Sequence, residues 1–144
     1  MQVKDVMTRG VECARPTDSI ARAAERMKEL NVGSLPVCGD NDKLVGLITD
    51  RDITTRATAE ACDPGSTCVS DAMTPDITYV FEDQDVQEAA RLMEQNQIRR
   101  LVVLNRDKRL VGIVSLGDLV VKTDEDKLSG EALEQVSEPA QPRR

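Results

Sequence analysis

Two short stretches of the chain place a hydroxyl and a carboxylate at the same spacing, and these residue types are the best suited to chemistry. The first stretch holds Thr49 and Asp52, and the second holds Ser115 and Asp118. In both, the order is Gly, two aliphatic residues, Thr or Ser, two further residues, and Asp. One pattern at two places indicates a shared structural or binding role.

Two interpretations of this pattern stay open. A hydroxyl residue followed three positions later by an acid is typical of a capping box, in which the two side chains close the start of a helix. The same geometry suits a ligand, because helix N-termini bind anions and a carboxylate one turn later can accept both hydroxyls of a ribose. Gly46 and Gly112 precede the hydroxyls and would let either a ligand or another backbone segment come close.

The remaining residue types exclude most catalytic and metal sites. The sequence contains no histidine, which removes histidine acid–base catalysis, the Ser-His-Asp triad and most zinc sites. It also has no glycine-rich phosphate loop, so we predict that the chain is not an enzyme and holds no metal. The four cysteines form no Cys-x-x-Cys pair and are interpreted as small buried or half-buried hydrophobes: Cys13, Cys38, Cys62 and Cys68.

The amino-acid composition limits the classes of partner that the chain can bind. The 144 residues carry a formal net charge of −7, which argues against nucleic acid as a partner, since its phosphates attract basic surfaces. No apolar run is long enough to cross a membrane and the first residues form no signal segment, so we expect a cytoplasmic protein with no membrane partner. Aromatic residues make up 1% of the chain and apolar residues 40%, which predicts an aliphatic core.

The two junctions belong to an internal repeat with a constant offset of 66 residues. Thirteen of the 51 residues from 3 to 53 are identical to the residue 66 positions later. Residues 3–8 align with 69–74, and residues 44–46 align with 110–112. A match of this length without a gap indicates a duplicated structural unit.

Each repeat reads as β-α-β-β-α. Apolar residues spaced three, four and seven apart predict the first helix, with Thr17 and Asp83 as N-caps in the two repeats. A second helix is predicted to start near Asp50 and near Leu116. The strands are predicted at 11–13, 34–38 and 44–48, and at 77–80, 100–104 and 110–114.

The fold class predicted from these elements is α+β, with two repeats packed on each other. One repeat of roughly 50 residues is too small to bury its own sheet, so the two copies need each other. The predicted divisions are 1–62 for the first repeat, 63–68 for a linker, 69–122 for the second repeat, and 123–144 for a polar, partly disordered tail.

These features resemble paired cystathionine-β-synthase (CBS) domains, the Bateman module. The resemblance rests on the Met-Thr pairs at 7–8 and 73–74, the amphipathic helix, the Leu-Pro-Val of 35–37 and the junction of 46–52, over residues 3 to about 121. The second copy also resembles a repeat of the gamma subunit of AMP-activated protein kinase. The resemblance implies two sheets packed with pseudo-twofold symmetry, and two clefts between the repeats that take adenine nucleotides.

The resemblance also assigns binding residues. Asp52 and Asp118 would hold riboses, and Thr49 and Ser115 would lie near phosphate or ribose. The cleft of Asp52 would be lined by Ile77, Thr78 and Tyr79. The cleft of Asp118 would be lined by Gly10, Val11, Glu12, Val32 and Gly33.

Arg99 and Arg100 match positions at which basic side chains meet phosphates in that gamma subunit. The first repeat has glycine and serine at the equivalent positions 33 and 34, although Arg51 could substitute, and acidic Asp50 would repel a phosphate there. We therefore expect unequal occupancy, with at least one cleft unable to hold a full triphosphate. The alternative for the arginine pair is a solvated pair at a helix end, and for Tyr79 it is half-buried packing.

The function predicted from the sequence is a non-catalytic, ligand-sensing regulatory module that binds AMP, ADP or ATP. NAD and S-adenosylmethionine are weaker candidates, and no resident cofactor is expected. The alternative is a dimerisation or protein-interaction module with empty clefts that regulates a partner in trans. A homodimer is expected, with the apolar helix faces around Met27 and Met93 as candidate contacts.

Overall fold

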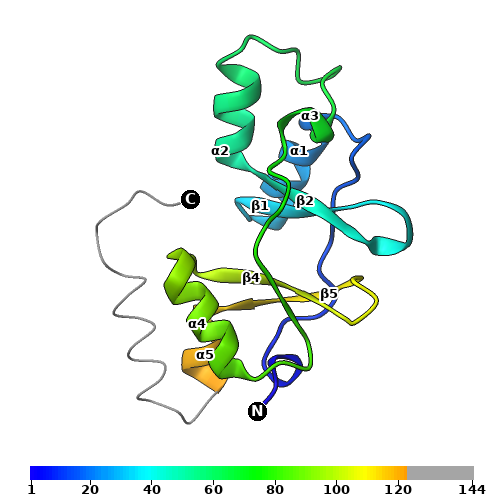
Figure 1. Ribbon diagram of the computed structural model, residues 1–144. Coiled ribbons are helices and arrows are strands. Elements are labelled where there is room, and N and C mark those ends of the chain that lie inside the picture. The colour runs from blue at the N-terminus through cyan, green and yellow to red at the C-terminus, as the bar shows by residue number, and fades with distance from the viewer. Residues whose placement is uncertain (123–144) are drawn as a thin grey trace. The chain divides into compact units, whose positions relative to one another are not determined.

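The computed structural model describes residues 1–122, which form an α+β fold of two compact units (Figure 1). The repeat-1 unit consists of Glu12–Ile77, and the repeat-2 unit consists of Met1–Val11 with the described chain from Thr78 onward. The predicted α+β class is confirmed. The predicted tail, residues 123–144, lies outside the described residues.

The repeat-1 unit contains a two-stranded antiparallel sheet with helices before and after it. Ser34 of the first strand lies opposite Thr49 of the second, and Val37 lies opposite Gly46. Instead of the strand predicted at 11–13, Ala14 forms a single parallel bridge to Val37. The elements are α1 (Ile20–Leu30), β1 (Ser34–Cys38), the 3-10 turn η2 (Asp40–Asp42), β2 (Leu44–Thr49), α2 (Asp50–Asp52), the π-helical η3 (Ile53–Thr58) and α3 (Val69–Ala72).

The repeat-2 unit contains a three-stranded sheet in the order β3-β4-β5, in which β3 is parallel to β4 and β4 antiparallel to β5. The strands predicted at 34–38 and 100–104 are confirmed to the residue, and the second helices begin at Asp50 and Leu116 as expected. The elements are η1 (Val3–Asp5), β3 (Tyr79–Phe81), α4 (Val86–Asn96), β4 (Arg100–Leu104), β5 (Leu110–Ser115) and α5 (Leu116–Lys122).

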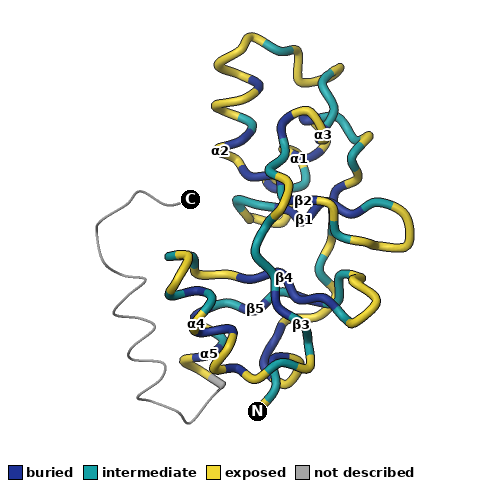
Figure 2. The backbone as a smooth tube through the Cα atoms, viewed as in Figure 1, coloured by how far each residue is buried: buried dark blue, intermediate teal, exposed yellow. Residues whose placement is uncertain are grey.

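Each unit has its own aliphatic core, and β1 and β4 are buried along most of their length (Figure 2). Met27 is 5% exposed and packs in the repeat-1 core, whereas Met93 is fully buried in the repeat-2 core. The apolar helix faces predicted as dimer contacts therefore fill the interior of their own units. The exposed apolar side chains at the end of α1 are those of Leu30 and Val32.

The opening segment of each repeat packs in the unit of the other repeat. In the repeat-2 unit, the Thr8 N–H donates to the Ile113 carbonyl at 2.8 Å and the Ile113 N–H donates back at 3.0 Å. In the repeat-1 unit, Thr74 and Leu47 exchange the equivalent bonds at 2.8 and 2.9 Å. The divisions predicted at 1–62 and 69–122 follow the sequence repeat, whereas the compact units exchange residues 1–11 and the segment that carries α3.

Gly46 and Gly112 make room for the exchanged segments. A Cβ on Gly112 would lie 2.6 Å from the Thr8 carbonyl oxygen, and a Cβ on Gly46 would lie 2.7 Å from that of Thr74. Such separations are far inside van der Waals contact. Of the two occupants left open by the sequence, a ligand or a backbone, the structure places a backbone against both glycines.

The N-caps of the long helices differ from the prediction. Ser19 caps α1 by accepting from the Arg22 N–H at 3.1 Å, and Asp85 caps α4 by accepting from the Gln87 N–H at 2.8 Å. Both caps lie two residues after the predicted Thr17 and Asp83.

Candidate functional site

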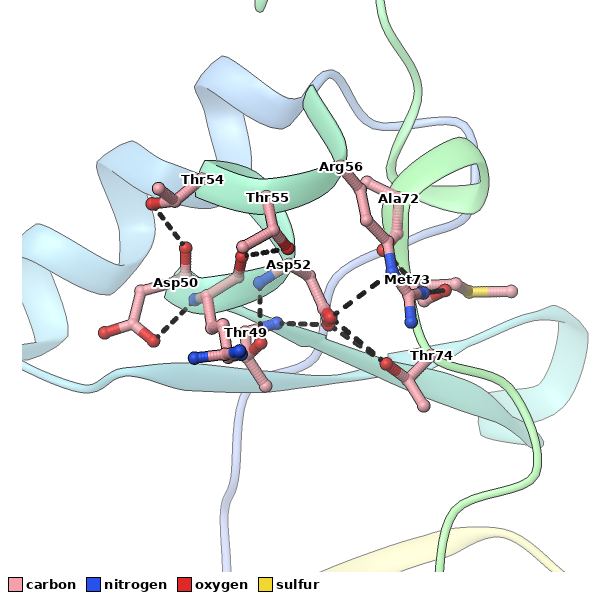
Figure 3. A network of polar contacts seen from close by, with 10 residues as sticks. Thr49, Asp50, Asp52, Thr54, Thr55, Arg56, Ala72, Met73 and Thr74 are labelled. Carbon is pink, nitrogen blue, oxygen red and sulfur yellow. Dashed lines mark hydrogen bonds and ion pairs between the residues drawn. The ribbon is translucent and has the colours of Figure 1, made fainter. Parts of the chain in front are cut away.

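The first junction is a capping box at the start of α2. The Thr49 hydroxyl accepts from the Asp52 N–H at 3.0 Å, and Oδ2 of Asp52 accepts from the Thr49 N–H at 3.1 Å (Figure 3). Both residues are buried, with 4% and 7% of their surface exposed. The structural interpretation of this pattern is therefore confirmed at Thr49 and Asp52.

The carboxylate of Asp52 also binds the exchanged segment. The Thr74 hydroxyl lies 3.2 Å from both Oδ1 and Oδ2 of Asp52, and the guanidinium Nε of Arg56 lies 3.9 Å from Oδ1 (Figure 3). Arg56 in addition donates from Nη1 to the Met73 carbonyl at 2.9 Å. Both oxygens of Asp52 thus have protein partners, and they join α2 to the segment after α3.

Thr74 and Arg56 were missed by the sequence interpretation. The signal available for Thr74 was its place in the repeated Met-Thr pair at 7–8 and 73–74, which marks a structural role but does not reveal the partner.

The second junction repeats the capping box with fewer partners. The Ser115 N–H donates to Oδ2 of Asp118 at 2.9 Å, and the Asp118 N–H donates to the Ser115 hydroxyl at 3.1 Å. Thr8 is the equivalent of Thr74, but it is exposed, and among the bonds of the described residues none joins its hydroxyl to Asp118. Among the side chains described in residues 1–121, none donates to Oδ1 of Asp118. Within the described part of the chain, one oxygen of the Asp118 carboxylate therefore has no side-chain donor, whereas both oxygens of Asp52 have one.

The strand register brings the arginine pair to the second junction. Arg100 lies directly opposite Ser115 at the ends of β4 and β5, and the Leu116 N–H donates to the Arg99 carbonyl at 2.8 Å. Residues opposite each other in an antiparallel pair point to the same face of the sheet. Both arginines are exposed, and no ion pair joins either of them to another residue of the described chain.

The first junction has the same backbone but a different charge. The Asp50 N–H donates to the Gly33 carbonyl at 2.9 Å, and Ser34 lies opposite Thr49. The residues beside the hydroxyl are thus neutral or acidic, and Arg51 is exposed next to them. The two junctions are therefore equivalent in fold and differ in local charge.

The other predicted cleft residues divide between the units. Glu12, Val32, Gly33 and Ile77 belong to the repeat-1 unit, whereas Gly10, Val11, Thr78 and Tyr79 belong to the repeat-2 unit. The Glu12 carboxylate is held by Arg26 at 2.9 Å. Tyr79 is half-buried and meets Phe81 edge to face at 5.5 Å, which agrees with a packing role. Their grouping into two nucleotide clefts stays a prediction.

A hollow of ≈ 390 Å³ lies between α1 and η3 in the repeat-1 unit. Val32 is the one predicted site residue in the lining of this hollow. Its lining consists of Ala24, Met27, Lys28, Asn31, Val32, Asp50, Ile53 and Thr54.

Two further features concern metals and membranes. Within the described residues, no three His, Cys, Asp or Glu side chains come together as a metal site would require. The helices found in that part of the chain are too short or too polar to cross a bilayer.

The fold and the paired junctions define a tandem-repeat domain, and comparison with known proteins identifies its family. The chain belongs to the CBS domain family, whose profile matches residues 3–58 and again residues 69–128. The two matches correspond to the two sequence repeats.

Two relatives match most of the chain. The CBS domain-containing protein YhcV of Bacillus subtilis is 42% identical over 135 residues, which cover 94% of each chain. Hypoxic response protein 1 of Mycobacterium tuberculosis is 38% identical over 116 residues, which cover 81% of this chain and 80% of that protein.

Solved structures of the family resemble the fold. The structure of hypoxic response protein I, which has two coordinated zinc ions, matches with a TM-score of 0.78 and 36% identity over 85% of this chain and 99% of that one. CBSX2 in complex with AMP matches with a TM-score of 0.72 and 33% identity, over 83% and 93% of the two chains. The CBS domain pair of MJ0100, in complex with 5-methylthioadenosine and S-adenosyl-L-methionine, matches with a TM-score of 0.71 and 30% identity, over the same shares. Paired CBS domains of this fold therefore include ligand-binding proteins.

Proposed function

We propose that the chain is a non-catalytic regulatory module that binds an adenine nucleotide at the second junction. The observation that carries this proposal is the pairing of Arg100 with Ser115 beside Asp118, one carboxylate oxygen of which meets no side-chain donor among the described residues. A carboxylate accepts ribose hydroxyls, and guanidinium groups bind phosphate oxygens in a two-pronged geometry. The AMP complex of CBSX2 and the two adenosine ligands of MJ0100 support the ligand class.

Within this class, the arginine pair favours phosphate-bearing ligands. AMP, ADP and ATP place negative charge where Arg99 and Arg100 supply positive charge, whereas S-adenosylmethionine carries a positive sulfonium. We therefore rank the adenine nucleotides above S-adenosylmethionine. The first junction is the weaker site in this proposal, because Asp52 already uses both oxygens within the protein.

The test is a calorimetric titration of the protein with AMP, ADP, ATP, NAD, S-adenosylmethionine and adenosine. Asp118→Asn removes the carboxylate acceptor and is expected to weaken AMP binding by about ten- to a hundredfold. The matched variant Asp52→Asn is expected to lower the stability of the fold and to leave the affinity for AMP within about twofold. Equal losses of affinity in the two variants would contradict the assignment to the second junction.

The arginine pair has a separate readout. Replacing Arg99 and Arg100 with glutamine is expected to erase the advantage of AMP over adenosine, a loss of about tenfold or 1.4 kcal/mol. Binding of adenosine itself is expected to stay unchanged. Thermal unfolding gives an independent check, because a ligand at 100 times its dissociation constant raises the free energy of unfolding by about 2.7 kcal/mol. If no adenine compound raises the melting temperature at millimolar concentration, the proposal fails.

A second candidate function is self-association, with regulation of a partner protein in trans. It is favoured by Leu30 and Val32, which are 41% and 36% exposed, Leu30 at the end of α1 and Val32 in the lining of the hollow. Exposed apolar side chains that gather in a patch mark protein interaction sites. We expect the wild type to sediment as a homodimer and the Leu30→Lys, Val32→Lys variant as a monomer. A wild type that stays monomeric at high concentration would contradict this second function.

A further inference from the structure

Two of the four cysteines meet in the repeat-1 unit although they are far apart in the sequence. The Ala14 N–H donates to the Pro36 carbonyl at 2.8 Å, and the Cys38 N–H donates to the Ala14 carbonyl at 3.0 Å. This parallel bridge pairs Ala14 with Val37. Cys13 comes directly before one member of the pair, and Cys38 comes directly after the other.

The bridge places the two thiols beside each other. Ala14 and Val37 are fully buried and belong to the repeat-1 core. Cys13 and Cys38 flank this pair, and their thiols share a hydrogen bond. Burial and, to a smaller extent, the neighbouring Cys13 thiol raise the pKa of the Cys38 thiol to about 12.

Two arginines hold the backbone around the cysteines. Arg26 donates to the Cys13 carbonyl at 2.6 Å, and Arg15 donates to the Cys38 carbonyl at 3.2 Å and to that of Gly39 at 2.7 Å. These bonds hold the two chain segments that carry the thiols. Both are free in the structure, Cys38 being buried and Cys13 half-buried.

We propose that Cys13 and Cys38 form a reversible intramolecular disulfide and are a redox modification site of this protein. The bridged backbone brings the two side chains together, and the half-buried position of Cys13 gives a dissolved oxidant access to one of them. The bond would tie the chain to the end of β1 at the point where it enters the repeat-1 unit.

The oxidant is a low-molecular-weight disulfide, and the reaction is thiol–disulfide exchange. The Cys13 thiolate attacks one sulfur of the small disulfide, whose S–S bond breaks as one small thiolate leaves. Cys38 then gives up its proton and attacks the Cys13 sulfur of the mixed disulfide, which releases the second small thiolate. Both small thiolates take up protons, so two protein thiols are oxidised while one small disulfide is reduced to two thiols.

The test uses the full chain, with glutathione disulfide as the probe, followed by tryptic digestion without reduction. Cys13 falls in peptide 10–22, because Pro16 blocks cleavage after Arg15, and Cys38 falls in peptide 29–43. Cys62 and Cys68 share peptide 57–91 and cannot imitate this link. The expected product is peptide 10–22 joined to peptide 29–43 in a monomeric protein, lighter by two hydrogen atoms and restored by dithiothreitol.

Variants separate the pair from the other cysteines. The Cys62→Ser, Cys68→Ser variant is expected to form the same link at the same rate, and Cys13→Ser is expected to lose it. Cys13 is half-buried, so its serine variant tests the pair without opening the core as a change at Cys38 would. The proposal is overturned if Cys13 stops at the mixed disulfide with glutathione, if both thiols stay reduced, or if the link joins two chains.

Discussion

Asp52 and Asp118 occupy equivalent positions in the repeat, but different side chains surround them, and one difference is a hydroxyl. Both close a capping box with the residue three positions earlier. Thr74 donates to Asp52, whereas its equivalent Thr8 leaves Asp118 without this bond. The same motif thus fixes an exchanged segment in one unit and keeps an acceptor open in the other. The sequence could predict the motif, but the partner of each carboxylate depends on contacts between distant residues.

The first prediction concerns this hydroxyl. Thr74→Val keeps the shape of the side chain and removes the bond to the buried Asp52, so the free energy of unfolding should fall by about 1–2 kcal/mol. The control is Thr8→Val, at the equivalent exposed position, where we expect a change within about 0.5 kcal/mol. Urea unfolding followed by circular dichroism measures both. Equal effects of the two substitutions would contradict a structural role for the Thr74–Asp52 contact.

The second prediction concerns the close approach of Gly112 to the backbone of Thr8. In Gly112→Ala the new Cβ would meet the Thr8 carbonyl oxygen at 2.6 Å, so the exchanged segment has to shift. We expect a loss of about 1–3 kcal/mol in unfolding free energy, as for other overpacked sites.

Gly65→Ala serves as the control, because its Cβ would lie 3.7 Å from Asp63 in ordinary contact. This substitution should change the stability by less than about 0.5 kcal/mol. If Gly112→Ala changes the stability as little as Gly65→Ala does, the close approach of Gly112 to the Thr8 backbone is wrong.

At the scale of elements, the hairpin strands were predictable because local signals agree. In each repeat, an aliphatic strand ends at a polar turn and a second aliphatic strand follows it. The turns close with equivalent bonds, from the Gly39 N–H to the Lys43 carbonyl at 2.9 Å and from the Asn105 N–H to the Arg109 carbonyl at 3.0 Å. No contact with a distant segment is needed to set these boundaries.

The caps of the long helices were predicted two residues too early, and distant backbone groups also bond at the helix starts. The Ile20 N–H at the start of α1 donates to the Thr67 carbonyl at 2.9 Å, and the Val86 N–H at the start of α4 donates to the Met1 carbonyl at 3.0 Å. Distant backbone groups therefore take part in setting where these helices begin. The carboxylate of Asp83, the predicted cap, is instead paired with Arg106 at 2.8 Å.

The third prediction distinguishes the observed cap from the predicted one. Ser19→Ala removes the acceptor for the Arg22 N–H and should cost about 1 kcal/mol of stability. Thr17→Ala should cost less than about 0.5 kcal/mol, because Thr17 is exposed and lies before the helix. Thermal unfolding of the two variants beside the wild type provides the measurement, and a larger loss from Thr17→Ala would favour the original cap.

At the scale of the whole molecule, the exchange of opening segments was hidden by the repeat itself. Val3, Met7 and Thr8 are identical to the residues 66 positions later. Either copy of the segment therefore fits either unit by sequence, and no residue pattern shows which one it enters. The alignment of the repeats predicts which elements each unit contains. It does not predict which opening segment packs in which unit.

The fourth prediction follows from this exchange. A fragment of residues 12–77 contains a complete repeat-1 unit, including Val69 and Ala72 of its core, and should unfold cooperatively. A fragment of residues 1–62, cut at the end of the first sequence repeat, lacks both core residues. It also lacks the Thr67 carbonyl, which accepts from the Ile20 N–H at the start of α1. It should show no cooperative transition. Circular dichroism melting of both fragments is the measurement, and a folded 1–62 fragment would show that the exchanged segment is dispensable.

The exchange also sets an order of events during synthesis on the ribosome. Val3, Val6 and Met7 are translated long before Leu116 and Leu119, which belong to the same core. At about 5–20 residues per second, the nascent amino-terminal segment waits roughly 5–20 s for its binding site to be translated. Residues 12–77 of the repeat-1 unit are translated in full during this delay, so the segment that precedes them is among the last to reach its native place.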